Sequence, residues 1–121
     1  FNHIKGRSYE DSKYLENIDK CENLLQQKRE KPLFRPPYGR ISRSQIKKIK
    51  SKYEIIMWDV LSYDFDKNIS DDQCLQKTIA STRPGSIIVF HDSEKNAALT
   101  INVVSKYIQH FKNEGYSFQP L

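Results

Sequence analysis

The sequence predicts an α/β protein in which helices and strands alternate along the chain. Three observations favour this class: apolar residues recur at helical spacing in several stretches, short apolar runs lie between these stretches, and turn-forming residues separate the two kinds of segment. Strands that alternate with helices of about 10–20 residues are typical of parallel βαβ units. The order should be α-β-α-β-α-β-α-β, which fits either an open doubly wound sheet or part of a (β/α) barrel.

The first predicted helix covers residues 9–28. Its apolar positions repeat every three or four residues, as one buried helix face requires; they are Leu15, Ile18, Cys21, Leu24 and Leu25. Pro32 follows soon afterwards and ends the helix, because proline lacks the backbone donor that a helix needs. Residues 33–35 should then form a short strand that leads into a proline turn.

A second helix and a second strand follow this turn. Ser42 or Ser44 can cap the helix, since a serine side chain accepts hydrogen bonds from the backbone amides of the first turn. Ile46 and Ile49 should face inward. Residues 53–60 are apolar almost throughout, which is typical of a strand buried on both faces.

The second half of the chain repeats this pattern. The Ser-Asp-Asp-Gln sequence at 70–73 is a capping-box pattern that should open a helix running to about Thr82. Residues 86–90 form another continuous apolar strand. The last helix has its apolar positions at Ala97, Leu99, Ile101, Val104, Ile108 and Phe111. Gly115 should end it, and residues 116–119 should close the fold with a strand.

Composition predicts one globular domain. The chain has 121 residues, 37% hydrophobic and 29% charged, and no apolar run approaches the roughly 18 residues of a membrane helix. A formal charge of +5 favours an anionic partner in general, but the lysines are interspersed with acids, as in residues 28–31. No nucleic-acid-binding motif is present, so we expect no nucleic acid partner. No signal peptide is visible, although this carries little weight in a chain that opens on Phe1 rather than Met.

The two cysteines, Cys21 and Cys74, are isolated and lack the spacing of a metal site. Both lie where a helix would bury a small residue, so we expect them to pack in a core. A disulfide between them remains an open alternative.

Polar or ionisable residues follow three of the predicted strands. Arg35 and Tyr38 follow the first, Asp59 and Asp64 lie at the end of the second, and His91 follows the third. Functional groups gather at the carboxyl ends of parallel strands. We therefore expect these side chains to share one rim of the sheet.

Strand parity refines this expectation. Side chains two residues apart in a strand point to the same face, so Val89 should project beside His91, and Asp59 beside Leu61. From spacing alone, the alternative for His91 is a strand-terminal histidine bonded to a neighbour. Asp64 could likewise serve only to form a turn.

Three motifs in this order resemble the polysaccharide deacetylases, the NodB-homology domain of carbohydrate esterase family 4. They are FRPPYG at 34–39, WDVLSYDF at 58–65 and IIVFHDS at 87–93. The resemblance covers the whole chain but only about the C-terminal three-fifths of a typical family domain. It implies a partial, distorted (β/α) barrel that lacks its N-terminal strands, as a single truncated domain over residues 1–121.

The resemblance also implies an activity. Members of this family hydrolyse acetyl groups from sugar polymers, with a divalent metal held by one Asp and two His and a second Asp acting as base. The Asp-Asp motif is absent here. The opening FNHIKGRSY resembles the family's His-x-x-x-His motif entered partway, which would make His3 one metal ligand, with zinc the expected metal. These 121 residues alone should therefore not turn over substrate.

Further roles follow from the same resemblance. Arg35 would orient the catalytic aspartate, and Pro37 would hold Tyr38 so that its backbone N–H meets the oxyanion. His91 would be the general acid that protonates the departing amine, since imidazole titrates near working pH. Val89 would line the pocket for the acetyl methyl group, where the family usually has Leu.

One motif departs from the family pattern. The family's fourth motif often reads Asp-x-x-Asp-Trp, in which the first Asp tunes the histidine or the arginine. Here Leu61 stands at the first Asp, Asp64 at the second, and Phe65 replaces Trp. Our hypothesis is that Asp59, on the same strand face as Leu61, takes the tuning role. Trp58 is expected to belong to the core or to the groove wall.

The leading hypothesis is thus a piece of a hydrolase that removes N-acetyl groups from peptidoglycan or a chitin-like polymer. We expect it to work outside the cytoplasm or at the cell envelope, and to pair with a preceding segment or another chain. The alternative is a catalytically dead relative that serves as a carbohydrate-binding or scaffold module.

Overall fold

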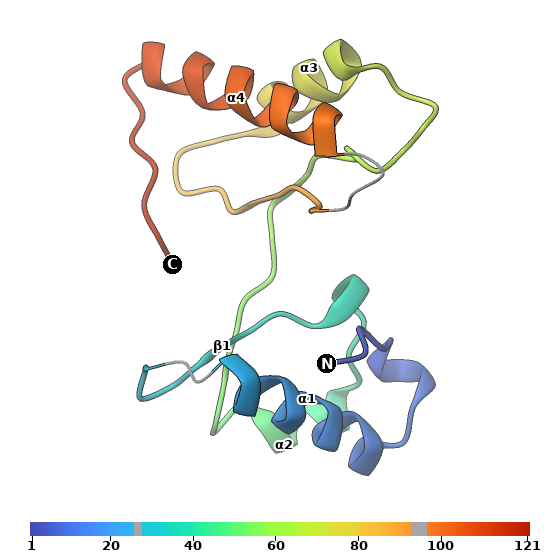
Figure 1. Cartoon of the computed structure of the whole chain (residues 1–121). Helices are drawn as coiled ribbons and strands as arrows, with labels where there is room; N and C mark the ends of the chain where they lie inside the picture. Colours follow the sequence, from blue (N-terminus) through green and yellow to red (C-terminus); the bar gives the residue numbers. More distant parts are fainter. Residues whose placement is uncertain (26–27, 93–96) are drawn as a thin grey trace. The chain divides into compact units, whose positions relative to one another are not determined.

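The computed structural model describes residues 1–25, 28–92 and 97–121. They form two compact units, residues 1–57 (unit 1) and 58–121 (unit 2), which we describe one at a time (Figure 1). That the whole chain is a single domain stays a prediction.

Unit 1 has two helices and one parallel pair of strands. Its elements are α1 (Asp11–Leu25), β1 (Leu33–Phe34), α2 (Arg43–Ile49) and β2 (Glu54–Ile55), with short 3-10 turns at Gly6–Ser8 and Pro37–Gly39. Leu33 pairs with Glu54 and Phe34 with Ile55. The predicted helix at 9–28 is thus confirmed over 11–25, and residues 26–27 lie outside the described part.

The core of unit 1 lies between its helices and strands. Its buried residues are Tyr14, Ile18, Ile41, Ile49 and Tyr53. Leu24 and Leu25 were expected on the buried face of α1, but they are 70% and 62% exposed. Helix α2 has seven residues and α1 has fifteen, so α2 spans only about half the length of α1.

The choice between two capping serines in unit 1 is settled by hydrogen bonds. Ser42 caps α2, since its side chain accepts from the Gln45 backbone and its own N–H donates to the Gln45 side chain. Ser44 instead donates to Asp11 at 3.1 Å. Gln45 is buried and also donates to the carbonyl of Gly6 at 2.9 Å, which ties α2 to the start of the chain.

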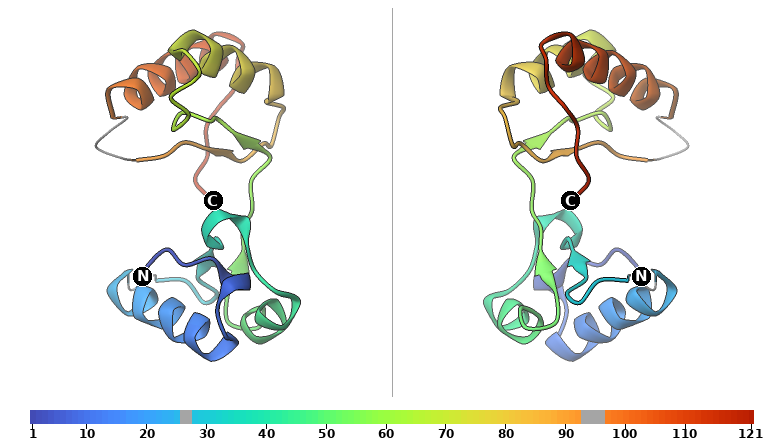
Figure 2. Two further views of the ribbon diagram at one scale, coloured as in Figure 1. Left: turned by 90° about the vertical axis from the view of Figure 1, so that its right-hand side faces the viewer. Right: turned by 90° about the vertical axis from the view of Figure 1, so that its left-hand side faces the viewer.

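Unit 2 repeats the same architecture. Its elements are β3 (Val60–Leu61), α3 (Asp71–Ser81), β4 (Ile88–Val89) and α4 (Ala97–Asn113). The strands are parallel, with Val60 beside Ile88 and Leu61 beside Val89. Helices α3 and α4 pack against each other, and Figure 2 shows both on the same side of the strand pair.

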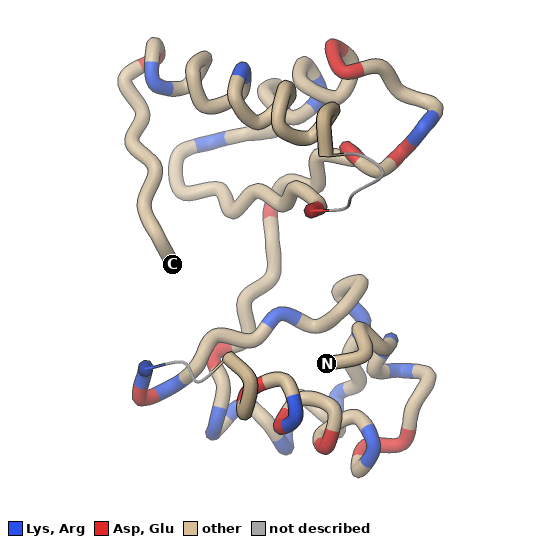
Figure 3. The backbone as a smooth tube through the Cα atoms, in the orientation of Figure 1, with Lys and Arg blue, Asp and Glu red and all other residues tan. Residues whose placement is uncertain are grey.

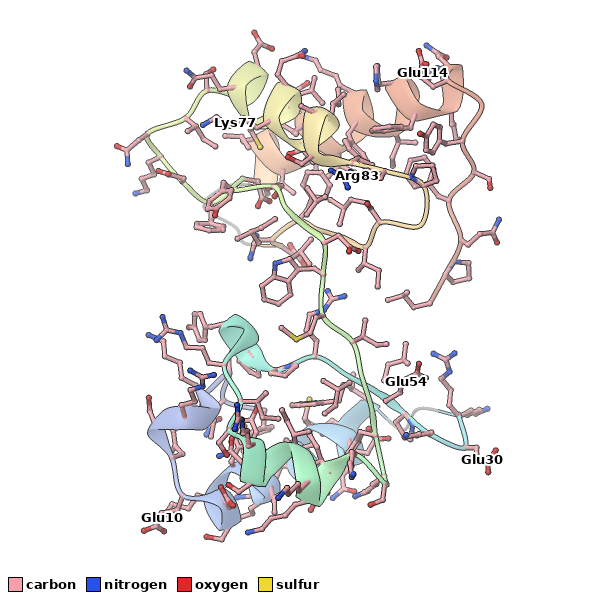
Figure 4. All side chains as sticks on the ribbon, turned by 180° about the vertical axis from the view of Figure 1, so that it is seen from behind. Glu10, Glu30, Glu54, Lys77, Arg83 and Glu114 are labelled. Atoms are coloured by element: carbon pink, nitrogen blue, oxygen red, sulfur yellow. The ribbon has the colours of Figure 1, made fainter. Side chains whose placement is uncertain are left out.

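The helices of unit 2 enclose a partly aromatic core, whose side chains are drawn in Figure 4 with Lys77 marking α3 and Glu114 following α4. Tyr107 lies at its centre, with ring centroids 5.7 Å from Phe90 and 4.9 Å from Phe111. Its hydroxyl is 2.9 Å from the Thr82 hydroxyl at the end of α3, so the buried polar atom is satisfied.

The cysteines are both free. Cys74 is completely buried in unit 2, as expected, whereas Cys21 is only half-buried in unit 1. Core packing is therefore confirmed for one of the two.

Two predicted strands differ from the structure. The expected strand at 53–60 is divided into β2 and β3, which pair in different two-stranded sheets, and Met57 between them is 42% exposed. Residues 116–119 form no strand, because among the described residues none pairs with them along a ladder. Gly115 does end α4, with a φ of +84° that favours glycine.

The α/β class is confirmed, with parallel strand pairs and four helices among the described residues. A partial barrel is not confirmed, because the sheet structure of the described residues consists of two separate pairs of two-residue strands.

The surface charges are mixed rather than segregated, as Figure 3 shows along α1 and α2. Three lysines of unit 1 pair with acids, at N–O distances of 2.6–2.9 Å: Lys20 with Glu16, Lys48 with Asp11 and Lys52 with Asp19. This agrees with the solvated helix faces expected from the sequence. In the described parts of the chain, no helix is both long and apolar enough for a membrane span.

The capping box of α3 offers a test of the local folding argument. Ser70 accepts from the Gln73 backbone at 3.2 Å and donates its own backbone N–H to the Gln73 side chain at 3.0 Å. We expect Ser70→Ala to lower the free energy of unfolding by about 1 kcal/mol, because a first-turn amide loses its acceptor. Ser70→Asp, which keeps an acceptor, should retain most of the stability in urea denaturation followed by circular dichroism. Equal stability of the alanine variant and the unmodified protein would contradict this account.

Candidate functional site

The candidate residues of unit 1 gather around the proline turn after β1. Arg35 donates from Nε to the carbonyl of Ile56 and from Nη2 to that of Met57, each at 3.3 Å. Within the described residues Arg35 forms no ion pair. Its guanidinium thus holds the backbone that follows β2, and the carboxylate partner expected from the sequence is not among its contacts.

The turn itself holds Tyr38 in an unusual backbone conformation. Pro36 is buried and extended, Pro37 opens the 3-10 turn, and Tyr38 has φ +56°. Left-handed backbone in a residue with a Cβ costs about 1 kcal/mol or more and persists only where the surroundings impose it. Tyr38 is 59% exposed, so the imposed feature is its backbone rather than a buried ring.

His3 lies next to this turn. Its ring meets the Tyr38 ring edge-on, with centroids 5.1 Å apart, and Lys5 lies over the same ring at 5.0 Å. His3 also has a positive φ, +51°. A pocket of about 280 Å³ within unit 1 is lined by His3, Arg35 and Pro37 together with apolar residues of α1 and β1.

The residues present do not by themselves fit a metal site. Among the described residues no group of three or more His, Cys, Asp or Glu side chains is placed to hold an ion. His3 is a single imidazole, and a structural or catalytic zinc takes at least three protein ligands.

Unit 2 brings two candidates into direct contact. The Nδ1 atom of His91 lies 2.8 Å from Oδ1 of Asp64, and the His91 backbone N–H donates to Oδ2 of Asp64 at the same distance. One carboxylate thereby fixes both the main chain and the ring of the histidine that follows β4. The sequence motif had placed both residues in the site without predicting this contact.

Asp64 is fully buried, yet it stays ionised. Burial raises its pKa, but hydrogen bonds from the His91 backbone and ring, and from Ser62 and Thr100, outweigh burial and leave the pKa below its usual value. An ionised carboxylate only accepts hydrogen bonds, so the Nδ1 atom of His91 carries the shared hydrogen. Among the described residues, no hydrogen bond is made by the second ring nitrogen, Nε2.

The imidazole is also fixed by aromatic contacts. The Phe65 ring meets it edge-on, with centroids 4.6 Å apart, and Tyr63 lies 5.8 Å beyond Phe65. The side chain of His91 remains 39% exposed, whereas that of Asp64 is fully enclosed. A histidine held by a buried carboxylate and open to solvent on its other side can exchange a proton with a bound molecule.

The remaining candidates of unit 2 lie near this pair in sequence. Val89 is half-buried in β4, and Trp58 is half-buried before β3. A pocket of about 290 Å³ is lined by Phe90, His91 and residues of the start of α4, without Val89. The acetyl pocket expected at Val89 stays a prediction.

The hypothesis that Asp59 takes the tuning role stays a prediction. Asp59 accepts a hydrogen bond from the backbone N–H of Ile87 at 2.8 Å, which links the segments leading into β3 and β4. The carboxylate that contacts His91 is Asp64. Side chains that share a strand face reach the same neighbours only where the strand is regular, and β3 begins after Asp59, at Val60.

Two residues of this network were missed by sequence reasoning. Ser62 donates to Oδ1 of Asp64 at 2.7 Å and Thr100 donates to Oδ2 at 2.9 Å. Ser62 could have been found, since it lies two residues before Asp64, where serine commonly bonds locally. Thr100 is 36 residues away on α4, and no local pattern points to it.

Comparisons with known proteins show what the whole chain is similar to. A peptidoglycan N-acetylglucosamine deacetylase of Bacillus cereus is 27% identical over all of this chain, which spans 45% of that relative. A solved peptidoglycan N-acetylglucosamine deacetylase superposes with a TM-score of 0.88 and 26% identity, covering all of this chain and 58% of that one. No protein-family model matches the chain.

A third similar protein is described as a pseudoenzyme. A pseudoenzyme of carbohydrate esterase family 4 from Bacillus anthracis superposes with a TM-score of 0.81 over 97% of this chain and 41% of that one, at 21% identity, which speaks for the fold alone. The resemblance read from the sequence is confirmed: over its whole length the chain is similar to polysaccharide deacetylases of this family. Its coverage fits a C-terminal portion of such a protein.

The lowered pKa of Asp64 predicts how stability depends on pH. A carboxyl group whose folded pKa is lowered stabilises the protein above its unfolded pKa of about 4, and this stabilisation is lost as pH falls through the folded value. At neutral pH we expect Asp64→Asn to cost about 2 kcal/mol or more, because buried donors lose a charged acceptor.

The measurement is a series of urea denaturations from pH 7 to pH 2. The difference between the unmodified protein and Asp64→Asn should be constant above about pH 5 and shrink below about pH 4. Asp72→Asn, at an exposed aspartate of α3, serves as the control and should show a small difference throughout. A difference for Asp64→Asn that is independent of pH would show that the carboxyl is not held ionised by its partners.

Proposed function

We propose that the protein containing this chain is a polysaccharide deacetylase that hydrolyses N-acetyl groups of a sugar polymer. The observation that carries the proposal is the buried, ionised Asp64 bonded to Nδ1 of the partly exposed His91. A buried carboxylate that holds a partly exposed imidazole in one tautomer leaves the second ring nitrogen to give or accept a proton. The chain spans about half of its relatives, so the proposal concerns the whole protein.

The reaction needs a proton at one defined moment. Water adds to the acetamide carbonyl carbon, the C–N bond then breaks, and the sugar nitrogen leaves as an amine once it is protonated. Protonated His91 can supply this proton from Nε2 while Nδ1 stays bonded to Asp64. The negative charge of Asp64 stabilises the imidazolium before transfer, as the buried aspartate does in other Asp-His pairs.

Roles for unit 1 are proposed from the family resemblance. The Tyr38 backbone N–H would stabilise the oxyanion that forms when water attacks, and its imposed φ of +56° supports a donor that does not reorganise during reaction. Pro37 would keep this turn rigid. Arg35 would orient a carboxylate of the whole protein; in the described residues it binds two carbonyls instead.

The proposed substrate is peptidoglycan or a chitin-like polymer. The curated relative of Bacillus cereus is named for peptidoglycan N-acetylglucosamine, and both candidates carry the same N-acetylated sugar. Next to His91, the exposed rings of Phe65 and Tyr63 offer flat apolar surface on which a sugar ring can lie. Either polymer implies action outside the cytoplasm or at the cell envelope.

The first test is acetate release from an N-acetylglucosamine oligomer by the full-length protein. We expect His91→Asn to lower kcat by about 10²–10⁴-fold, the usual contribution of a general acid. His110→Asn is the matched control, since this second histidine of unit 2 packs on Phe111 and should keep full activity. If the unmodified protein releases no acetate, the alternative of a catalytically dead sugar-binding relative replaces the proposal.

A divalent metal, with zinc as first candidate and His3 as one ligand, is a separate proposal from the resemblance. It predicts that a chelator abolishes acetate release and that added zinc restores it. We also expect His3→Ala to bind less zinc than the unmodified protein in equilibrium dialysis, since one ligand is lost. Full activity after exhaustive chelation, with no zinc bound, would exclude this part of the proposal.

A further inference from the structure

The Asp64 carboxylate accepts hydrogen bonds from Ser62 and Thr100, which the proposed function does not use, and Thr100 is the more distant in sequence. The hydroxyl of Thr100, in the first turns of α4, donates to Oδ2 of Asp64 at 2.9 Å and lies 3.3 Å from the carbonyl of His91. Thr100 is thereby in contact with both members of the pair. The Thr100 hydroxyl makes both contacts directly.

We infer that Thr100 is a positioning residue, which fixes the orientation of the Asp64–His91 pair from α4. The expected effect of Thr100 on catalysis rests on the proposed function. Its contact with the pair is independent of that function. The proposed role of Thr100 is exerted through its hydrogen bond to Asp64.

The geometry of the carboxylate explains why this one hydroxyl matters. Oδ1 of Asp64 accepts from Ser62 at 2.7 Å and from the His91 ring at 2.8 Å. Oδ2 accepts from the His91 backbone at 2.8 Å and from Thr100 at 2.9 Å. A carboxylate has about four acceptor positions, so this set occupies them all and selects one rotation of the group.

Each donor comes from a different part of unit 2. Ser62 directly follows β3, His91 follows β4, and Thr100 belongs to α4, so the carboxylate joins all three. Without the Thr100 hydroxyl, Oδ2 would keep only the backbone donor, and nothing from α4 would oppose rotation of the carboxylate. The imidazole follows the carboxylate plane because their contact is a directional hydrogen bond.

Few other titratable groups face this network. Besides His91, the described neighbour is Cys74 on α3, whose thiol donates to the Ser62 carbonyl at 3.2 Å. Burial, and next the charge of Asp64, raise the pKa of this thiol, which therefore stays neutral. Asp92 is exposed. The only buried negative charge among the described groups here is thus the Asp64 carboxylate.

The test compares Thr100→Val with Thr100→Ser. Valine keeps the shape and removes the hydroxyl, and serine restores it. In the full-length protein we expect Thr100→Val to shift the ¹⁵N resonance of His91 Nδ1, to lower kcat about 10–100-fold and to leave KM nearly unchanged, because small misplacements of a catalytic group have large effects on rate. Thr100→Ser should recover most of both signals.

Thr82→Val supplies a matched control for the loss of a threonine hydroxyl. Thr82 is also partly buried in unit 2, where it bonds the Thr78 carbonyl and Tyr107, away from the pair. We expect Thr82→Val to lower the midpoint of thermal unfolding, as Thr100→Val should, but to leave the His91 resonances and kcat unchanged.

Two outcomes would overturn the inference: unchanged His91 resonances in Thr100→Val, or an equal change in Thr82→Val. If the protein has no deacetylase activity, the proposed function fails, yet the resonance of His91 Nδ1 still decides whether Thr100 positions the pair. The two failures are therefore distinguishable.

Discussion

The buried carboxylate of Asp64 is the interaction on which unit 2 depends. It is the meeting point of the residues that follow β3 and β4 with helix α4, and it accepts four hydrogen bonds there. A buried charge is costly unless its partners are complete. The hydrogen bonds that offset the cost of burying the carboxylate also fix His91. Stability and the candidate chemistry therefore depend on the same contacts.

In unit 1, the neutral side chain of Gln45 joins separate segments, as the Asp64 carboxylate does in unit 2. Gln45 is buried, caps the start of α2 together with Ser42, and reaches the Gly6 carbonyl with its amide nitrogen. In both units, strands of two residues supply little pairing, and a buried polar side chain joins segments far apart in the sequence. Such residues restrict the arrangement more than apolar packing does, because hydrogen bonds are directional.

Local patterns predicted well where the physics is local. The capping boxes at Ser42 and Ser70 and the end of α4 at Gly115 are properties of a few adjacent residues. Residues 53–60 were predicted as one strand because apolar composition cannot reveal where pairing partners lie, and Thr100 was missed because its contact depends on how α4 packs. Spacing placed Asp64 and His91 among the candidates without revealing that they touch, because this contact depends on how the segments after β3 and β4 meet.

The left-handed backbone of Tyr38 has a consequence for sequence variation. At φ +56° any Cβ is strained, and a β-branched side chain is strained most, so the position selects residues by backbone tolerance. Valine and isoleucine would be rejected there whatever the pocket requires, while glycine and asparagine would be accepted without contributing an aromatic ring. In a library of all amino acids at this position, the first selection would therefore be for variants in which the turn still folds. Only the variants that fold would show how the side chain affects activity.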